Sequence, residues 1–355
     1  MSIDDQYMQR CLQLARKGEG FTAPNPMVGC VIVCGNKIIG EGWHRKYGEA
    51  HAEVNAINSV KNKKILSEAV LYVSLEPCSH YGKTPPCTAL IIEHGIPKVV
   101  VATVDPNPQV SGKGIEILRN AGVEVVSGVL EQEAKALNRI FFINQIQKRP
   151  YVILKWAQSA DGFIDRKREI NDGMQPAKFS NELSAIVVHR LRTHVQAIMV
   201  GTNTALLDNP QLTARYWYGE NPVNVVIDKT GKLPLTAAIF NSDSRVIVFT
   251  QTENYKITKE NIVVVNIDFQ ADVNDQILKK LFELKLSSIL VEGGAALLNS
   301  FIEKSLWDEA FIEVSPLKLV SGIRAPAIDF KSPDYKTFHN NIRFHLKNAT
   351  TQKFI

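Results

Sequence analysis

The strongest constraint on the fold of this chain is a pair of short stretches, His51-Ala52-Glu53 and Glu76-Pro77-Cys78, followed by a second cysteine at Cys87. Together they supply an imidazole, two thiols and a carboxylate two residues beyond the imidazole. These are the groups of a zinc site that activates water beside a proton-shuttling acid. The sequence therefore predicts a fold that brings His51, Cys78 and Cys87 together as zinc ligands. Glu53 would move protons without ligating the metal.

A structural zinc is the alternative to a catalytic one. A closed structural site needs a fourth protein ligand, which His80 or His44 could supply, and it needs no special carboxylate. The joint pattern of His-x-Glu with Pro-Cys favours the catalytic alternative, because a catalytic zinc keeps its fourth position for water. Cys87 also stands at an expected helix start, where free amide groups and the helix dipole favour a thiolate.

The spacing of the two cysteines departs from the usual pattern of nucleobase zinc deaminases, in which two residues separate them. Here eight residues, 79–86, stand between Cys78 and Cys87. The additional loop places His80 and Lys83 at the mouth of the expected site. Both suit an anionic or hydrogen-bonding group of a substrate, the alternative being a solvated surface loop.

Strands and helices alternate around these motifs, which predicts an α/β fold with much of its sheet parallel. The hydrophobic patterns predict strands over residues 28–33, 37–43, 69–75, 99–104 and 123–126, and helices over 4–17, 52–60, 87–94, 114–121 and 131–147. The first two strands should form a hairpin at Cys34-Gly35-Asn36, where positive φ is needed. Cys11 and Cys30 are expected to be small core residues.

A domain boundary is expected at Lys148-Arg149-Pro150, because 355 residues exceed what one hydrophobic core usually serves. This gives domains over 1–147 and 148–355. Further strands are expected over 151–156, 197–200, 223–227, 246–249, 262–267, 288–291 and 310–314. No Gly-x-Gly-x-x-Gly follows any of them, so a Rossmann site is not indicated. Gly293-Gly294, between a strand and a helix, is either a phosphate cradle or a tight turn needed for packing.

Charge and cysteine usage limit the partners and the compartment. The formal charge of +5 comes from 41 basic and 36 acidic residues that are scattered along the chain. Such an excess gives little support to a nucleic-acid partner and fits an anionic small molecule equally well. Five cysteines in the first quarter, without a secretory signal or an apolar run of membrane-spanning length, predict a cytoplasmic protein.

Motifs throughout the chain resemble the bifunctional deaminase/reductase family of riboflavin biosynthesis. In the first half they are Pro24-Asn25-Pro26, Val28-Gly29-Cys30, Gly42-Trp43-His44, His51-Ala52-Glu53, Glu76-Pro77-Cys78, Gly82 to Cys87 and Asp105-Pro106-Asn107-Pro108. In the second half they are Lys155, Ser159-Ala160-Asp161-Gly162, Gly201 to Thr204, Asp208-Asn209-Pro210, Leu212-Thr213-Ala214-Arg215 and Val291-Glu292-Gly293-Gly294.

The resemblance implies a cytidine-deaminase-like three-layer α/β/α domain followed by a dihydrofolate-reductase-like α/β domain. The first would deaminate a diamino-hydroxy-phosphoribosylamino-pyrimidine with Zn²⁺, and the second would reduce its ribosyl side chain to ribityl with NADPH. A homo-oligomer, a dimer or higher, is also implied, with no nucleic-acid or membrane partner. By the same resemblance, Asn25, His44, His80 and Lys83 would hold the deaminase substrate.

The resemblance assigns the second domain's site in the same way. The reductase substrate would meet Lys155, Arg192, Leu212, Arg215 and Glu292, and the cofactor would meet Ala157, Lys178, Thr204, Asp208, Gly293 and Gly294. Guanidinium forks such as Arg192 and Arg215 pair bidentately with phosphate. Lys155 alone could equally be solvated.

One departure from the family lies in the second half. A serine and then a tryptophan commonly precede a threonine or serine there, whereas this chain has Pro176-Ala177-Lys178-Phe179-Ser180 after an altered, charged stretch over 166–175. Lys178 cannot pack a cofactor as tryptophan would, although it could pair with a cofactor phosphate.

Two other functions are alternatives to this interpretation of the sequence. One is a deaminase of nucleic-acid bases, against which stand the long cysteine loop and the lack of a basic, aromatic-interleaved stretch. The other is a zinc-stabilised nucleotide-binding module without catalysis.

Overall fold

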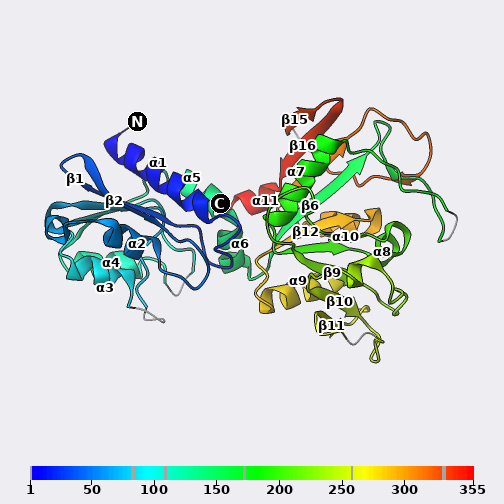
Figure 1. Cartoon of the computed structure of the whole chain (residues 1–355), viewed down its shortest axis with the longest axis horizontal. Helices are drawn as coiled ribbons and strands as arrows, with labels where there is room; N and C mark the ends of the chain where they lie inside the picture. Colours follow the sequence, from blue (N-terminus) through cyan, green and yellow to red (C-terminus); the bar gives the residue numbers. More distant parts are fainter. Residues whose placement is uncertain (1, 81–84, 108–109, 171–172, 257–258, 330–332) are drawn as a thin grey trace. The chain divides into compact units, whose positions relative to one another are not determined.

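The chain forms two compact units, each with its own sheet (Figure 1). The computed structural model describes the chain except residues 1, 81–84, 108–109, 171–172, 257–258 and 330–332. The first unit comprises Met1–Gln147 with Phe354–Ile355, and the second comprises Lys148–Lys353. No helix in the described part of the chain has the length and apolar character needed to cross a membrane.

The first unit is built on a five-stranded sheet in the order β2-β1-β3-β4-β5. β1 is antiparallel to β2 and β3, whereas β3, β4 and β5 are parallel. The strands are β1 Gly29–Cys34, β2 Lys37–Trp43, β3 Val70–Val73, β4 Lys98–Val101 and β5 Glu124–Ser127. The helices are α1 Ile3–Ala15, η1 Arg16–Gly18, α2 Ala52–Ser59, η2 Lys63–Glu68, α3 Cys87–Glu93, α4 Lys113–Asn120, α5 Glu131–Leu137 and α6 Arg139–Gln147.

Helices cover both faces of this sheet and give three layers. Apolar residues of α2, α3 and α4, among them Ile57, Ile91 and Leu118, form one buried cluster with the strands. Residues of α1 and α5 form a second cluster against the opposite face of β1, β3 and β4, and Cys11 is fully buried in it. The α/β/α layering and the hairpin, in which Gly35 and Asn36 both have positive φ, agree with the sequence pattern.

One helix of the prediction is interrupted. The pattern over 131–147 predicted a single helix, but α5 and α6 are separated at Asn138. The Asn138 side chain is buried and bonds the Met27 backbone twice, accepting from its N–H at 2.8 Å and donating to its carbonyl at 2.9 Å. These long-range bonds fix the loop that carries Asn25, and periodicity alone does not report them.

The second unit is built on a nine-stranded sheet in the order β11-β10-β9-β8-β12-β6-β13-β16-β15. The strands from β11 to β13 run parallel, and β16 and β15 add an antiparallel edge. The strands are β6 Tyr151–Gln158, β7 Phe163–Asp165, β8 Ala197–Val200, β9 Val223–Ile227, β10 Val246–Thr250, β11 Ile262–Asn266, β12 Ser288–Gly293, β13 Glu309–Val314, β14 Ile323–Arg324, β15 Asp334–Phe338 and β16 Asn341–Lys347. The helices are α7 Glu182–Thr193, α8 Thr202–Asp208, η3 Ala238–Phe240, α9 Val273–Glu283, α10 Ala295–Glu303 and α11 Ala349–Gln352.

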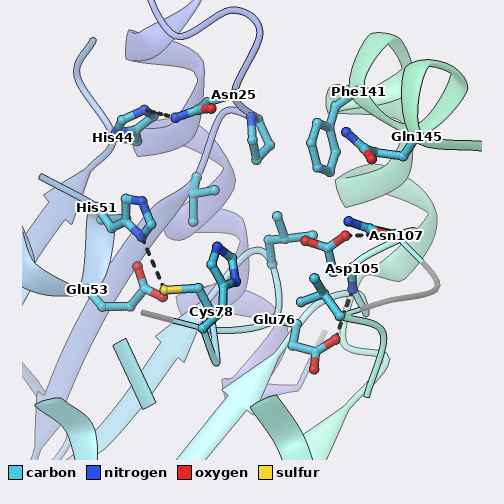
Figure 2. A pocket seen from close by; sticks show the side chains of 16 residues that line it. Asn25, His44, His51, Glu53, Glu76, Cys78, Asp105, Asn107, Phe141 and Gln145 are labelled. Carbon is cyan, nitrogen blue, oxygen red and sulfur yellow. Dashed lines mark hydrogen bonds between the residues drawn. The ribbon is translucent and has the colours of Figure 1, made fainter. Parts of the chain in front are cut away.

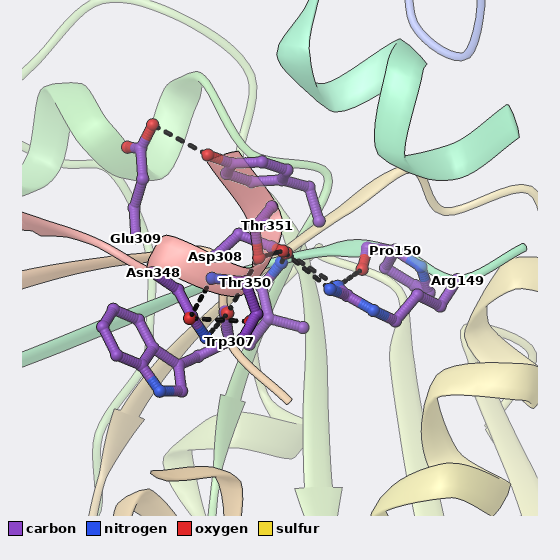
Figure 3. A network of polar contacts seen from close by, with 10 residues as sticks. Arg149, Pro150, Trp307, Asp308, Glu309, Asn348, Thr350 and Thr351 are labelled. Carbon is purple, nitrogen blue, oxygen red and sulfur yellow. Dashed lines mark hydrogen bonds and ion pairs between the residues drawn. The ribbon is translucent and has the colours of Figure 1, made fainter. Parts of the chain in front are cut away.

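A buried ion pair connects the first residues of the second unit with segments near its C-terminal end (Figure 3). Arg149 donates two hydrogen bonds of 2.7 Å to the carboxylate of Asp308, whose side chain is fully buried. The same carboxylate accepts from the Val152 N–H at 2.6 Å and from the Thr351 hydroxyl at 2.9 Å. The start of β6, the start of β13 and the short α11 therefore share one anchoring carboxylate.

Candidate active sites

The three predicted metal ligands lie together in the first unit, with their ligand atoms within 4.8 Å of one another. Figure 2 shows two of them, His51 and Cys78. His51 is the N-cap residue of α2, Cys78 lies in the segment after β3, and Cys87 begins α3 behind Pro86. Nδ1 of His51 lies 3.5 Å from Sγ of Cys78 and 3.4 Å from Sγ of Cys87. The backbone N–H of Cys87 donates to Sγ of Cys78 at 3.3 Å, which helps a thiolate at that position.

These distances fit a zinc ion. Zn–S bonds of about 2.3 Å and Zn–N bonds of about 2.0–2.1 Å at a tetrahedral angle place the nitrogen and sulfur donors roughly 3.5 Å apart. Among the described residues, His51, Cys78 and Cys87 form the only such cluster, and neither His44 nor His80 belongs to it. The donor set therefore matches an open three-ligand site rather than a closed four-ligand one.

The surroundings of the cluster perturb its acids. Hydrogen bonds with Cys87 and His51 lower the pKa of the Cys78 thiol to about 4. Glu53, at the second position of α2, is only 3% exposed, and its burial raises the pKa of its carboxyl group to about 7. A carboxyl group that titrates near neutrality can both accept and return a proton. Figure 2 shows its carboxylate beside Cys78.

A cavity of 260 Å³ opens onto this cluster. Asn25, His44 and His80 line it, as the resemblance implies, and Lys83 lies outside the described residues. Nδ1 of His44 donates to the Ala50 carbonyl at 3.1 Å, so its Nε2 is left to accept from the Asn25 amide at 3.2 Å. This pair presents a fixed tautomer and a fixed amide orientation to the cavity.

Some residues that line the cavity were not predicted as site residues from the sequence. Among them, Asp105, Asn107, Phe141 and Gln145 face the metal cluster across the cavity (Figure 2). Asp105 and Asn107 belong to the motif Asp105-Pro106-Asn107-Pro108, but nothing in their spacing ties them to Cys78. Phe141 and Gln145 lie on α6 at helical spacing, and the break at Asn138 separates that helix from α5. Only the folded structure brings these four residues to the cavity, so their sequence positions do not identify them as site residues.

The second unit holds a cavity of 690 Å³. Of the predicted reductase residues, those that line it are Lys155, Ala157, Lys178, Thr204, Asp208, Glu292 and Gly294. Arg192, Leu212, Arg215 and Gly293 are not among its lining residues. Gly293 has a φ of +127°, which favours glycine, and its peptide bond to Gly294 is cis. Gly294 is the N-cap of α10 without a capping side chain, so amide groups of that helix start remain free for an anion.

Arg192 forms hydrogen bonds both to Glu292, which lines the cavity, and to the loop that contains Thr213. Its guanidinium donates two hydrogen bonds, of 3.0 and 2.7 Å, to Glu292, and a third of 2.8 Å to the Thr213 carbonyl. Burial alone would raise the pKa of Glu292, but Arg192 outweighs it and holds that pKa below its usual range. The pKa of Lys155 is lowered by burial. Leu212 is buried with a φ of +57°, and Arg215 is exposed beside this loop.

The altered stretch supplies an arginine to the same cavity. Arg168 donates to Asp165 at 2.8 Å through Nε and to the Leu207 carbonyl at 3.1 Å, and it pairs with Asp208. Its side chain is 3% exposed. The predicted cofactor residue Asp208 is therefore held by an arginine that this departure from the family provides. Lys178 lines the cavity and is exposed.

Comparisons with known proteins find relatives of both units. Residues 1–103 match the cytidine and deoxycytidylate deaminase zinc-binding region, and residues 150–333 match the RibD C-terminal domain. A riboflavin biosynthesis protein RibD of Aquifex aeolicus is 43% identical over 333 residues, 93% of this chain and 92% of the relative. One from Actinobacillus pleuropneumoniae is 41% identical over 332 residues, 91% and 86% of the two chains.

Solved structures resemble the whole chain as well. A diaminohydroxyphosphoribosylaminopyrimidine deaminase/5-amino-6-(5-phosphoribosylamino)uracil reductase of Thermotoga maritima has a TM-score of 0.85 at 37% identity, covering 98% of this chain and 99% of that one. A RibD structure from Acinetobacter baumannii has a TM-score of 0.83 at 32% identity, covering 97% and 98%.

Fold and sites together define an enzyme with a zinc-binding deaminase domain and a reductase domain. The identities over nearly the full length make the assignment specific: the chain belongs to the RibD family of bifunctional deaminase/reductases, which serve two steps of riboflavin biosynthesis.

Proposed function

We propose that the first unit hydrolyses the exocyclic 2-amino group of 2,5-diamino-6-(5-phosphoribosylamino)pyrimidin-4-one. The second unit then uses NADPH to reduce the ribosyl side chain, giving 5-amino-6-(5-phosphoribitylamino)uracil. The observation that carries the first step is the cluster of His51, Cys78 and Cys87 beside a buried acid in a cavity. The name of the Thermotoga maritima relative, whose reductase acts on a uracil, supports the order of the two steps.

His51, Cys78 and Cys87 would hold zinc, which supplies the Lewis acidity that makes water nucleophilic at neutral pH. Glu53 takes the proton of the attacking water and returns it to the leaving amine, so that ammonia departs. Its pKa of about 7 suits both transfers. The Asn25–His44 pair orients the pyrimidine, and His80 and Lys83 are the residues proposed to meet the ribose phosphate.

In the second unit, the free amides at the start of α10 would hold the cofactor's phosphates beside Gly294. NADPH, when bound, would supply the hydride that reduces the sugar carbon bonded to nitrogen. The ring oxygen, released as the C–O bond to that carbon breaks, would take a proton from water. Lys155 and the Arg192–Glu292 pair position the sugar, and Lys178 pairs with a cofactor phosphate. Arg215, exposed beside the Arg192-bound loop, would meet the substrate phosphate.

The compartment and assembly belong to the same proposal. We propose a cytoplasmic location, which is supported by five cysteines that form no disulfide with one another. A homo-oligomer stays a prediction of the resemblance.

The test is ammonia release from two substrates by protein of known zinc content. The proposal predicts one zinc per chain and ammonia from the phosphorylated diaminopyrimidine, with none from cytosine in single-stranded DNA. Protein without stoichiometric zinc, or with the opposite substrate preference, would contradict it.

A further inference from the structure

The carboxylate of Glu76 accepts hydrogen bonds from four backbone N–H groups, of which Figure 2 shows the one from Asp105. Its Oε2 accepts from Asp105 at 3.1 Å and from Gly112 at 3.0 Å. Its Oε1 accepts from Gly114 at 2.8 Å and from Ile115 at 3.4 Å. Glu76 is only 5% exposed, so water could not easily take its place as the acceptor for these N–H groups. Leaving them without an acceptor would be unfavourable.

Three of these N–H groups belong to the start of α4. Gly112 is the N-cap residue of this helix, has a φ of +78° and has no side chain to cap it. A helix start leaves its first N–H groups without partners inside the helix. Glu76 supplies the missing acceptor from a distant segment, and its negative charge also suits the positive end of the helix dipole.

The helix start is pressed against the segment that carries the metal ligand. A Cβ atom on Gly114 would lie 2.2 Å from the carbonyl oxygen of Pro77, the residue between Glu76 and Cys78. Only glycine permits this approach. Glu76 is thus joined through the chain to Cys78 and through hydrogen bonds to α4.

The fourth N–H group belongs to the opposite wall of the deaminase cavity. Asp105, whose N–H Glu76 binds, accepts in turn from the Asn107 N–H at 2.8 Å through its own carboxylate. Asp105, Asn107 and Cys78 all line the cavity. One buried carboxylate therefore bonds the wall that faces the metal cluster, and it lies two residues from a metal ligand.

We infer that Glu76 is a positioning residue of the deaminase site, which sets the spacing between the Cys78 side of the cavity and the Asp105–Asn107 wall. The inference rests on the proposed deamination. Glu76 also lines the cavity, but both of its oxygens are taken up by the four backbone N–H groups, so it is given no part in the chemical step. Its loss should move the wall that receives the pyrimidine more than it disturbs the three metal ligands or Glu53.

The test compares Glu76→Gln and Glu76→Asp with wild type in the full-length, zinc-loaded protein. Glutamine keeps the length but replaces one oxygen by an NH₂ group that cannot accept, so two of the four N–H groups lose their partner. Misplacement by about 1 Å can cost up to about 100-fold, and we expect the KM for the pyrimidine to rise about tenfold. Zinc content should stay at one per chain, and kcat should fall much less than KM rises. Aspartate keeps the charge but moves it back by about 1.5 Å. The KM of the Glu76→Asp variant should therefore lie between the KM of Glu76→Gln and that of wild type.

Ser2→Ala is the matched control, because Ser2 caps α1 of the same unit and does not line the cavity. It should leave the KM unchanged. A purely structural role for Glu76 predicts a lower melting temperature with wild-type KM per zinc-loaded chain, and that result in the folded variants would overturn the inference. If glutamine prevents folding, the KM of the aspartate variant decides. Failure of wild type itself to release ammonia would instead refute the proposed deamination.

Discussion

Replacing Asp308 with alanine should destabilise the second unit more than most single substitutions do. The carboxylate is fully buried and is bonded by Arg149, the Val152 N–H and the Thr351 hydroxyl. The Arg149 side chain is only 11% exposed, so alanine removes the charged partner of a guanidinium that water reaches poorly, while neutral acceptors such as the Pro150 carbonyl remain. Removing one partner of such a pair lowers the free energy of unfolding by about 3–5 kcal/mol. Part of this loss arises because the Val152 N–H is left without its acceptor.

The assay is urea unfolding followed by tryptophan fluorescence. Trp156 and Trp307 are buried in the second unit, and the Asn348 amide, close to the Asp308 network, bonds the Trp307 carbonyl. With an m-value of about 2–3 kcal/mol/M, a loss of about 4 kcal/mol lowers the midpoint by roughly 1.5 M.

The double variant Asp308→Ala/Arg149→Ala separates the pair from its surroundings. Its loss in the free energy of unfolding should be clearly smaller than the sum of the losses in the two single variants, because neither charge of the pair then remains buried without the other. A single-variant loss below about 1 kcal/mol, or strict additivity in the double variant, would refute the reasoning.

Three further predictions concern the two sites. Glu53→Gln should lower the kcat of ammonia release by about 10²–10⁴-fold with zinc content unchanged, and an unchanged rate would remove Glu53 from the proton transfer. Chelation of zinc should abolish ammonia release but leave reduction of the deaminated intermediate intact, and loss of both would contradict separate sites. Burial, aided by Arg192 and Arg215, lowers the pKa of His189 to about 4. Because the unfolded chain then binds the proton first, stability of the second unit should fall as pH drops from about 6.5 to about 4. His189→Phe should flatten this dependence of the urea midpoint, and an unchanged slope would exclude His189 as its source.

Local pattern predicted most elements of the fold because strands such as 197–200 and 223–227 are continuous apolar runs between turn residues. The break at Asn138 depends on bonds to Met27, more than a hundred residues away, and leaves no trace in the periodicity. The antiparallel pair β15–β16 was not predicted, because the exposed β15 lacks an alternating apolar face.

The deaminase site was likewise predictable from the sequence only where local motifs specify it. His51, Glu53, Cys78 and Cys87 could be found because metal ligation demands these residue types at recognisable spacing. Glu76 belongs to the same motif, yet its bonds to Asp105 and the start of α4 depend on how segments distant in the chain pack together. Arg168 is similar: the altered stretch was visible in the sequence, but its contact with Asp208 was not.

If one chain carries out both steps in order, deamination must precede reduction. A single incubation of the zinc-loaded protein with the diaminopyrimidine phosphate and NADPH, following ammonia and NADPH absorbance together, tests this order. We expect ammonia to appear first and one NADPH to be oxidised for each ammonia released. Ammonia without NADPH oxidation would contradict the reductase half, and NADPH oxidation without ammonia would contradict the order of the two steps.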